Sequence, residues 1–219
     1  MDGTVMVALK KGKKGSARSL AAVRREAEGC RRCPLWKHAT QTVFGAGSSR
    51  APIMLVGEQP GDAEDRAGEP FVGPAGQLLR RALSEAGIDL ASVYLTNAVK
   101  HFKWTPRGKR RLHERPNHEE VMACRLWLDL EIERVRPTAI VALGATAAGA
   151  LLGAGVRIGR DRRKKFTSPL APFVTLTAHP SSILRTPDSA ARARALRQLV
   201  DDLRHVAAWV HGSKHDAQP

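Results

Sequence analysis

Short apolar runs alternate along the chain with longer segments in which apolar residues recur at helical spacing. The apolar runs have the length of buried strands and cover residues 53–56, 93–96, 138–143 and 173–177. The helical segments cover residues 74–86, 117–135, 145–152 and 190–210, and Gly87 and Gly153 end two of them as typical C-cap residues. Strands alternating with helices predict an α/β fold with three layers, α/β/α, around a central, mainly parallel four-stranded sheet.

The two ends of the chain differ from this pattern. Residues 1–17 are rich in lysine and glycine and lack apolar periodicity, so we interpret them as a basic flexible tail. Residues 18–211 form a single predicted domain, and residues 212–219 form a second flexible tail. No apolar run is long enough for a membrane span, and no early segment resembles a secretory signal. We therefore expect a cytoplasmic protein of a bacterial cell, acting as a monomer without membrane contact.

Polar residues follow each predicted strand. They are Glu58 and Asp62 after the first, Asn97 and His101 after the second, Thr146 after the third, and His179, Ser181 and Ser182 after the fourth. The carboxyl ends of parallel strands meet at one edge of a sheet, and α/β proteins bind their ligands there. The sequence therefore predicts a polar site at this edge.

Basic residues outnumber acidic ones. Lys and Arg total 36 against 21 Asp and Glu, which gives a formal charge of +15. This surplus favours a polyanionic partner, usually nucleic acid, although a basic surface that only aids solubility is the alternative. The basic run 160–165 fits either a contact with a DNA backbone or a solvent-exposed face.

The chain has three cysteines: Cys30, Cys33 and Cys124. An odd count in a chain without a secretory signal argues against a disulfide framework. Cys30 and Cys33 form a CxxC pair, which is typical of a metal or cluster site.

Four motifs at the predicted site resemble those of family 4 uracil-DNA glycosylases. They are GEQPG at 57–61, PFVGPAG at 70–76, NAVKH at 97–101 and HPSSILR at 179–185. The segment KRRLH at 109–113 resembles the KRRIH loop of the UdgX branch, which captures uracil-DNA covalently through the loop histidine. Leu112 stands where that loop has isoleucine, a similar apolar volume, and the resemblance runs from about Cys30 to Arg204.

The resemblance implies roles for the residues that recognise uracil. Asn97 would bind the N3–H and O4 side of uracil, and Phe71 would stack on the base, with Gln59 and His179 as further contacts. His179 would also donate to O2 as the base departs. From the residues alone, a core aromatic is the favoured interpretation of Phe71, and a turn residue at the end of a strand fits Asn97 equally well.

The resemblance also implies catalytic roles for Glu58 and Asp62. Either carboxylate would stabilise the sugar cation, or orient or deprotonate a nucleophile, and the sequence does not divide these roles. A capping role is the alternative for Asp62.

The resemblance makes His113 the nucleophile that traps C1′. Imidazole attacks only when neutral, and we expect Arg110 and Arg111 to disfavour its charged form. Arg111 would also position the loop. Six residues are expected to bind DNA: Lys109, Arg110, Arg111, Ser181, Ser182 and Arg185. The alternative is that the segment is only a phosphate-binding patch.

Family 4 enzymes hold a 4Fe-4S cluster with four cysteines, the third directly after an NAVK-like segment. That position is His101 here, so we expect Cys30, Cys33, Cys124 and His101 to hold the cluster, with zinc in a Cys3His site as the alternative. Taken together, the resemblance implies recognition of uracil in DNA, preferably single-stranded, cleavage of its glycosidic bond and lasting attachment of His113 to C1′. The alternatives are a conventional glycosylase that turns over and a non-catalytic, metal-containing module that binds nucleic acid.

Overall fold

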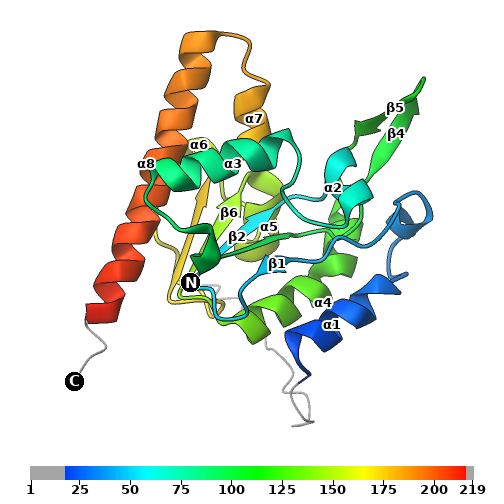
Figure 1. Cartoon of the computed structure of the whole chain (residues 1–219), viewed down its shortest axis with the longest axis horizontal. Coiled ribbons are helices and arrows are strands. Elements are labelled where there is room, and N and C mark those ends of the chain that lie inside the picture. Colours follow the sequence, from blue (N-terminus) through cyan, green and yellow to red (C-terminus); the bar gives the residue numbers. More distant parts are fainter. Residues whose placement is uncertain (1–17, 216–219) are drawn as a thin grey trace, which may run out of the picture.

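A five-stranded sheet lies at the centre of the molecule (Figure 1). The computed structural model describes residues 18–215, and the predicted tail 1–17 and residues 216–219 lie outside this range. The strands lie in the order β1 (Ala46–Gly47), β3 (Val93–Asn97), β2 (Ile53–Gly57), β6 (Ala139–Leu143) and β7 (Phe173–Thr177). The predicted four-stranded parallel sheet is confirmed, and β1 adds an antiparallel edge to β3. This edge was missed because two residues carry no periodicity.

Helices cover both faces of the sheet, as the alternation of strand residues requires. Ile53 and Leu55 pack with α3 (Pro74–Glu85) and α8 (Ser189–His215), and Met54 and Val56 pack with α4 (His118–Val135) and α5 (Ala145–Leu152). The predicted three layers are therefore confirmed. In the described part of the chain, no helix is both long and apolar enough to cross a bilayer.

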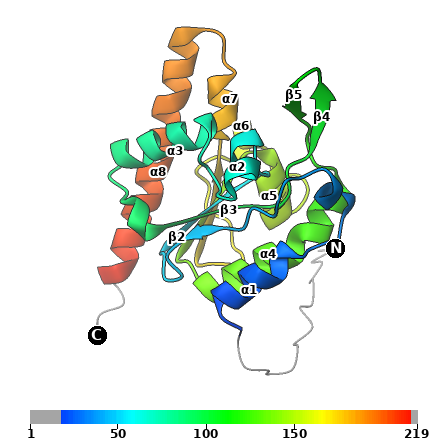
Figure 2. The ribbon, with the colours of Figure 1, turned by 45° about the vertical axis from the view of Figure 1, so that its right-hand side comes forward.

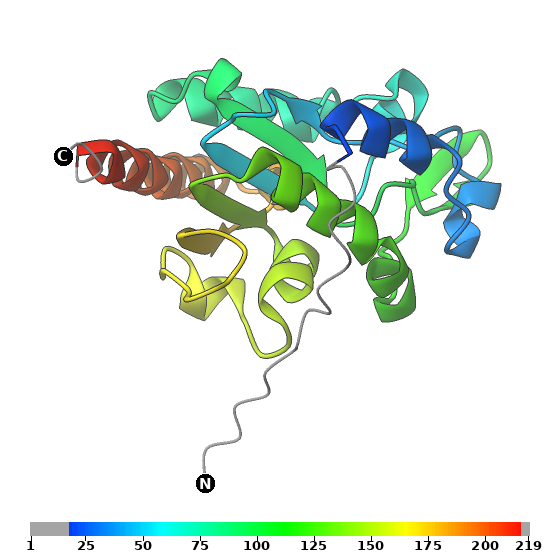
Figure 3. The ribbon, with the colours of Figure 1, turned by 90° about the horizontal axis from the view of Figure 1, so that it is seen from below.

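The structure also contains helices that the sequence pattern did not predict. They are α1 (Leu20–Glu28), the 3-10 turns Pro34–Lys37 and Leu90–Ser92, α2 (Asp62–Ala67), α6 (Ile158–Asp161) and α7 (Pro180–Leu184). Most of these helices are too short to show a helical period. Helix α1 packs on α4. Figure 3 shows α8 at one side of the molecule and α1 at the other. Helix α8 reaches His215, so it includes the first residues of the segment expected to be loose from 212 onward.

All of the KRRLH segment after Lys109 is a strand, which corrects the expectation of a loop. Strands β4 (Trp104–Arg107) and β5 (Arg110–His113) form a separate antiparallel hairpin, in which Trp104 lies opposite His113. Gly108, with φ +57°, begins its two-residue turn, a conformation that glycine adopts without strain. The hairpin projects from the body beside the sheet, and α7 with the start of α8 projects beside it (Figure 2).

Candidate active site

A cavity of about 500 Å³ opens at the carboxyl edge of the sheet, between the β4–β5 hairpin and α7. It brings together eight residues that the sequence singled out, namely Gln59, Asp62, Phe71, Asn97, His113, His179, Ser181 and Arg185. Leu184 also lines the cavity and was not predicted. The lining residues come from segments up to more than one hundred positions apart, so the fold and not the local sequence assembles this site.

Asn97 and Phe71 form a buried, flat part of the cavity wall. Two glycines make room for them. A Cβ on Gly57 would lie 2.3 Å from Asn97 Oδ1 and 2.7 Å from Phe71 Cζ, and one on Gly76 would meet the Phe71 carbonyl oxygen at 1.8 Å. Phe71 itself has φ +59°, a strained conformation for a bulky residue. Among the described residues, no protein group is hydrogen-bonded to the Asn97 side-chain amide. An aromatic face and an unpaired amide are therefore presented together to a planar ligand.

His179 is held by the start of α7. The backbone N–H of Ser181 donates to His179 Nδ1 at 3.1 Å, so the neutral ring carries its proton on Nε2. Burial lowers the pKa of His179 to about 4, and the positive charges of Arg185 and of protonated His113 act in the same direction. The ring stacks near Phe71, with 6.3 Å between centroids, and a Cβ on Gly144 would lie only 2.9 Å from its Cβ. His179 is thus a fixed, neutral hydrogen-bond donor.

His113 faces the cavity from the last position of β5. Its side chain is 49% exposed, and its Nε2 lies 3.5 Å from Glu58 Oε1. Burial lowers the pKa of His113, opposed by the Glu58 carboxylate and assisted by Arg185. We expected Arg110 and Arg111 to lower this pKa, and that expectation is wrong. Burial and Arg185 lower it instead, and the guanidinium of Arg111 is paired with two carboxylates.

Gln59 connects the body of the protein to the stem of the hairpin. Its Oε1 accepts from the Lys103 backbone N–H at 3.0 Å, and its Nε2 donates to the carbonyls of Lys103 and Glu114 at 3.2 and 2.9 Å. The same nitrogen lies 3.0 Å from His113 Nε2. Because Nε2 of Gln59 is a donor, this contact favours the His113 tautomer that carries its proton on Nδ1 and a lone pair on Nε2. The side-chain amide is therefore occupied by the hairpin rather than left open for uracil.

Arg111 is the second connection between the hairpin and the body. Its guanidinium, 14% exposed, pairs with Asp62 and with the fully buried Asp65, and it lies over the rings of Phe102 and Trp104. Burial raises the pKa of Asp62, but hydrogen bonds from Arg66 and Arg111 outweigh it and lower the pKa below its ordinary value. Arg111 therefore positions the hairpin and has little capacity left for a phosphate. No sequence pattern pointed to Asp65, which lies 46 positions from Arg111.

Glu58 lies behind His113. Its Oε2 accepts a short hydrogen bond from the Thr146 hydroxyl, and that hydroxyl in turn accepts from Arg115 Nε at 3.0 Å. The sequence placed Thr146 at this edge of the sheet, whereas Arg115 was missed because it lies beyond the hairpin in a segment without periodicity.

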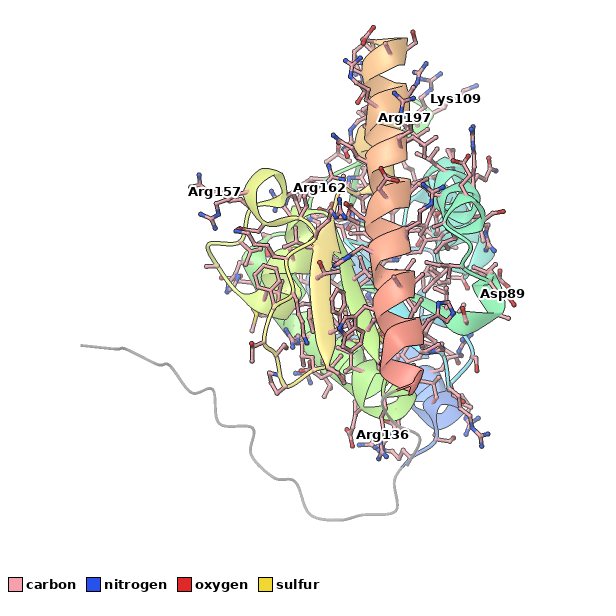
Figure 4. The ribbon with its side chains drawn as sticks, turned by 90° about the vertical axis from the view of Figure 1, so that its left-hand side faces the viewer. Asp89, Lys109, Arg136, Arg157, Arg162 and Arg197 are labelled. Carbon is pink, nitrogen blue, oxygen red and sulfur yellow. The ribbon has the colours of Figure 1, made fainter. Side chains whose placement is uncertain are left out.

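Exposed basic side chains surround the cavity mouth. Lys109 and Arg110 lie at the hairpin tip, and Arg185 lies on α7, where it donates to Ser181 Oγ at 3.2 Å. Ser182 is exposed but its hydroxyl donates to the His179 carbonyl. Figure 4 shows Lys109 and Arg197 at the same end of the molecule and Arg136 at the opposite end. Within the run 160–165, by contrast, Arg160 and Lys164 pair with Asp161, and Arg162 pairs with Asp202.

The three cysteines are buried free thiols in one apolar cluster that joins α1 and α4. Burial raises the pKa of the Cys124 thiol to about 12. His101 is a buried residue that follows shortly after β3 in the sequence. Its Nε2 is 2.9 Å from the Thr42 hydroxyl. Because that hydroxyl donates to the Ala27 carbonyl, His101 donates from Nε2, and its buried Nδ1 has a lone pair without a partner among the described residues.

These donors suit a metal or a cluster chemically. Within residues 18–212, however, no three His, Cys, Asp or Glu side chains lie close enough together to share an ion. Binding would therefore require the thiols to turn toward a common point.

Comparison with known proteins agrees with the geometry of the cavity. The sequence profile described as uracil DNA glycosylase superfamily matches residues 44–204. A type-4 uracil-DNA glycosylase of Pyrobaculum aerophilum is 39% identical over 165 residues, which cover 72% of this chain and 81% of that protein. A type-4 uracil-DNA glycosylase of Thermotoga maritima is 38% identical over 183 residues, which cover 83% and 89%. The chain therefore belongs to the uracil-DNA glycosylase superfamily.

Proposed function

We propose that this protein excises uracil from DNA and remains attached to the resulting sugar through His113. One observation carries the proposal: His179, a fixed neutral donor, and His113, a neutral imidazole whose Nε2 carries a lone pair, line the same cavity as Asn97 and Phe71. The relatives named as type-4 uracil-DNA glycosylases support the excision step.

The proposed reaction assigns one task to each group. Uracil, taken from a single strand or flipped from a duplex, stacks on Phe71 and pairs with the Asn97 amide. The C1′–N1 bond breaks, and its electron pair moves to uracil, whose developing charge on O2 is stabilised by the Nε2–H of His179. The lone pair of His113 Nε2 then forms a bond to C1′, and the imidazolium loses its Nδ1 proton to solvent.

The two carboxylates would have different roles. Glu58, 3.5 Å from His113 Nε2, would stabilise positive charge on the sugar and then on the imidazolium ring. Asp62 would act through Arg111 by holding the hairpin in place, because its carboxylate is paired with Arg66 and Arg111.

The DNA would lie across the basic rim formed by Lys109, Arg110 and Arg185, with single-stranded DNA as the preferred form. Arg185 lines the cavity, and Lys109 and Arg110 are exposed at the tip of the hairpin. Their charges would bind phosphates without reading sequence.

A conventional glycosylase that turns over is the second candidate. The exposure of His113, at 49%, and the type-4 relatives favour it, since water that reaches C1′ first would release the sugar. The two functions differ in their product. Mixing the protein with a labelled uracil oligonucleotide and separating the products on a denaturing gel distinguishes them. A shifted band that survives denaturation, and a histidine-linked peptide in mass spectrometry, support capture. Free uracil released many times per protein, without the band, would overturn it.

We further propose that Cys30, Cys33, Cys124 and His101 hold a 4Fe-4S cluster, with zinc as the rival. The unpartnered Nδ1 of His101 and the three thiols supply four ligands of suitable chemistry. When bound, the cluster would tie the segment after α1 to α4. Purified protein should show iron and a broad visible absorption band, both lost in Cys33→Ser. Stoichiometric zinc in a colourless protein would favour the rival.

A further inference from the structure

We propose that Thr146 is a positioning residue of the active site, which holds the Glu58 carboxylate in its working orientation and keeps its ion pair with Arg115 at a long distance of 3.9 Å. The inference rests on the proposed glycosylase chemistry, in which Glu58 stabilises positive charge on the sugar.

The direction of the hydrogen bonds follows from the chemistry of the three side chains. Arg115 Nε can only donate, and it donates to Thr146 Oγ1 at 3.0 Å. The hydroxyl proton of Thr146 must therefore point elsewhere, and it points to Glu58 Oε2. This chain of donors fixes one oxygen of the carboxylate and leaves Oε1 directed at His113 Nε2, 3.5 Å away.

The fold makes Thr146 the rigid member of this group. It is the second residue of α5, which begins directly after β6, and it is 7% exposed. Arg115, in contrast, has a side chain that is 67% exposed. A charge-stabilising group that is already oriented needs no rearrangement when positive charge develops, which is the main advantage of a preorganised site.

Arg115 is close enough to compete for the carboxylate. Its Nε lies 3.9 Å from Glu58 Oε2, with the Thr146 hydroxyl hydrogen-bonded to both. If the hydroxyl were removed, a small movement would let the guanidinium pair directly with Glu58, and such pairs are strong and bidentate. The carboxylate would then be neutralised where the sugar needs its charge.

Thr146→Val tests this with little change in shape, and Thr175→Val is a matched control. Thr175 is also a buried threonine, 3% exposed, but its hydroxyl has no partner among the described residues. Single-turnover release of uracil should slow roughly tenfold to a hundredfold in Thr146→Val, while the Kd for uracil-DNA stays within about twofold. Thr146→Ser should restore the rate, and Thr175→Val should leave it unchanged. A wild-type rate in Thr146→Val, or a Kd that weakens in proportion to the rate, would overturn the inference.

The double variant Thr146→Val/Arg115→Met tests the competition. Part of the lost rate should return, because no guanidinium remains to pair with Glu58. A further loss would overturn the proposed screening of Arg115.

Uracil release and covalent product are measured in the same samples, so the two proposals fail separately. If the wild-type protein releases uracil without a covalent product, capture by His113 is refuted. The rate of uracil release then still tests the role of Thr146. A wild-type protein that releases no uracil refutes both. An active wild type with an equally active Thr146→Val variant refutes only the inference.

Discussion

Two histidines face one cavity from opposite walls, and they are held in different ways. His179 follows β7 of the main sheet, and a backbone N–H fixes its tautomer. His113 belongs to a two-stranded sheet outside the central one, is 49% exposed, and depends on the side chains of Gln59 and Arg111 for its place. The group proposed for base departure is thus part of the main fold, whereas the group proposed for capture lies on an added element. Base release should therefore survive changes to the hairpin, but capture should not survive changes to the body.

Removing the imidazole of the hairpin tests this most directly. His113→Gly should abolish the covalent product completely while uracil release continues, because water can then reach C1′. The measurement is a denaturing gel together with chromatography of free uracil. A covalent band that persists in this variant would show that another side chain is the nucleophile.

Replacing His179, on the opposite wall, should impair uracil release and capture alike. His179→Ala removes a buried donor to the departing base, so uracil release and capture should fall together by roughly a hundredfold to a thousandfold. Single-turnover rates check this. Unequal losses of the two products would contradict the assignment of His179 to the shared step.

The sequence predicted the body better than the hairpin, for physical reasons. Strands such as 53–57 and 139–143 are buried on both faces, so they appear as continuous apolar runs. The hairpin is mostly exposed and highly charged, and its position depends on contacts 44 to 55 residues away in sequence. A local pattern cannot contain such contacts.

The candidate site was predicted in the same uneven way. The sheet-edge rule and the motifs placed Asn97, Phe71 and His179 correctly in the cavity. The resemblance implied that Arg111 positions the loop, but neither the resemblance nor the sheet-edge rule revealed that Gln59 binds the stem of the hairpin, or that Asp65 and Arg115 take part. Each of these depends on a partner distant in sequence.

The ionic connection of the hairpin should matter more for capture than for base release. Arg111→Gln leaves the fully buried Asp65 without its charge partner, which should lower the free energy of unfolding by about 3 kcal/mol. Capture should slow about tenfold while uracil release changes less. Arg66→Gln is the control, since its pair with Asp62 is largely exposed and should contribute less than about 1 kcal/mol. Equal effects of the two variants in thermal unfolding would contradict this.

Acid should affect capture through the hairpin histidine. Burial lowers the pKa of His113 below its ordinary 6.5, so the neutral form persists as the pH falls and is lost only on passing the lowered pKa. Since the pKa of His179 is about 4, that ring remains neutral over the same range. The single-turnover rate of capture should therefore reach half its maximum below pH 6.5. A midpoint above that value would contradict the lowered pKa.

The smallest effects are expected at the hairpin tip. Lys109→Gln should reduce the slope of log affinity against log salt by about one, without altering the choice of uracil over other bases. Arg136→Gln, at the opposite end of the molecule in Figure 4, should leave the slope unchanged. Equal slopes for both variants would place the DNA elsewhere.

The stem of the hairpin has a consequence for how this fold can vary. The backbone N–H of Glu114 donates to the carbonyl of Lys103 at 3.0 Å, so the chain leaves the body and returns to it at adjacent points. A segment whose two ends lie side by side can be removed, or inserted into another protein, without disturbing the strands of the main sheet. The proposed covalent capture would thus be a portable trait on this scaffold, and grafting residues 103–114 onto another member of the superfamily is the direct way to test whether it transfers.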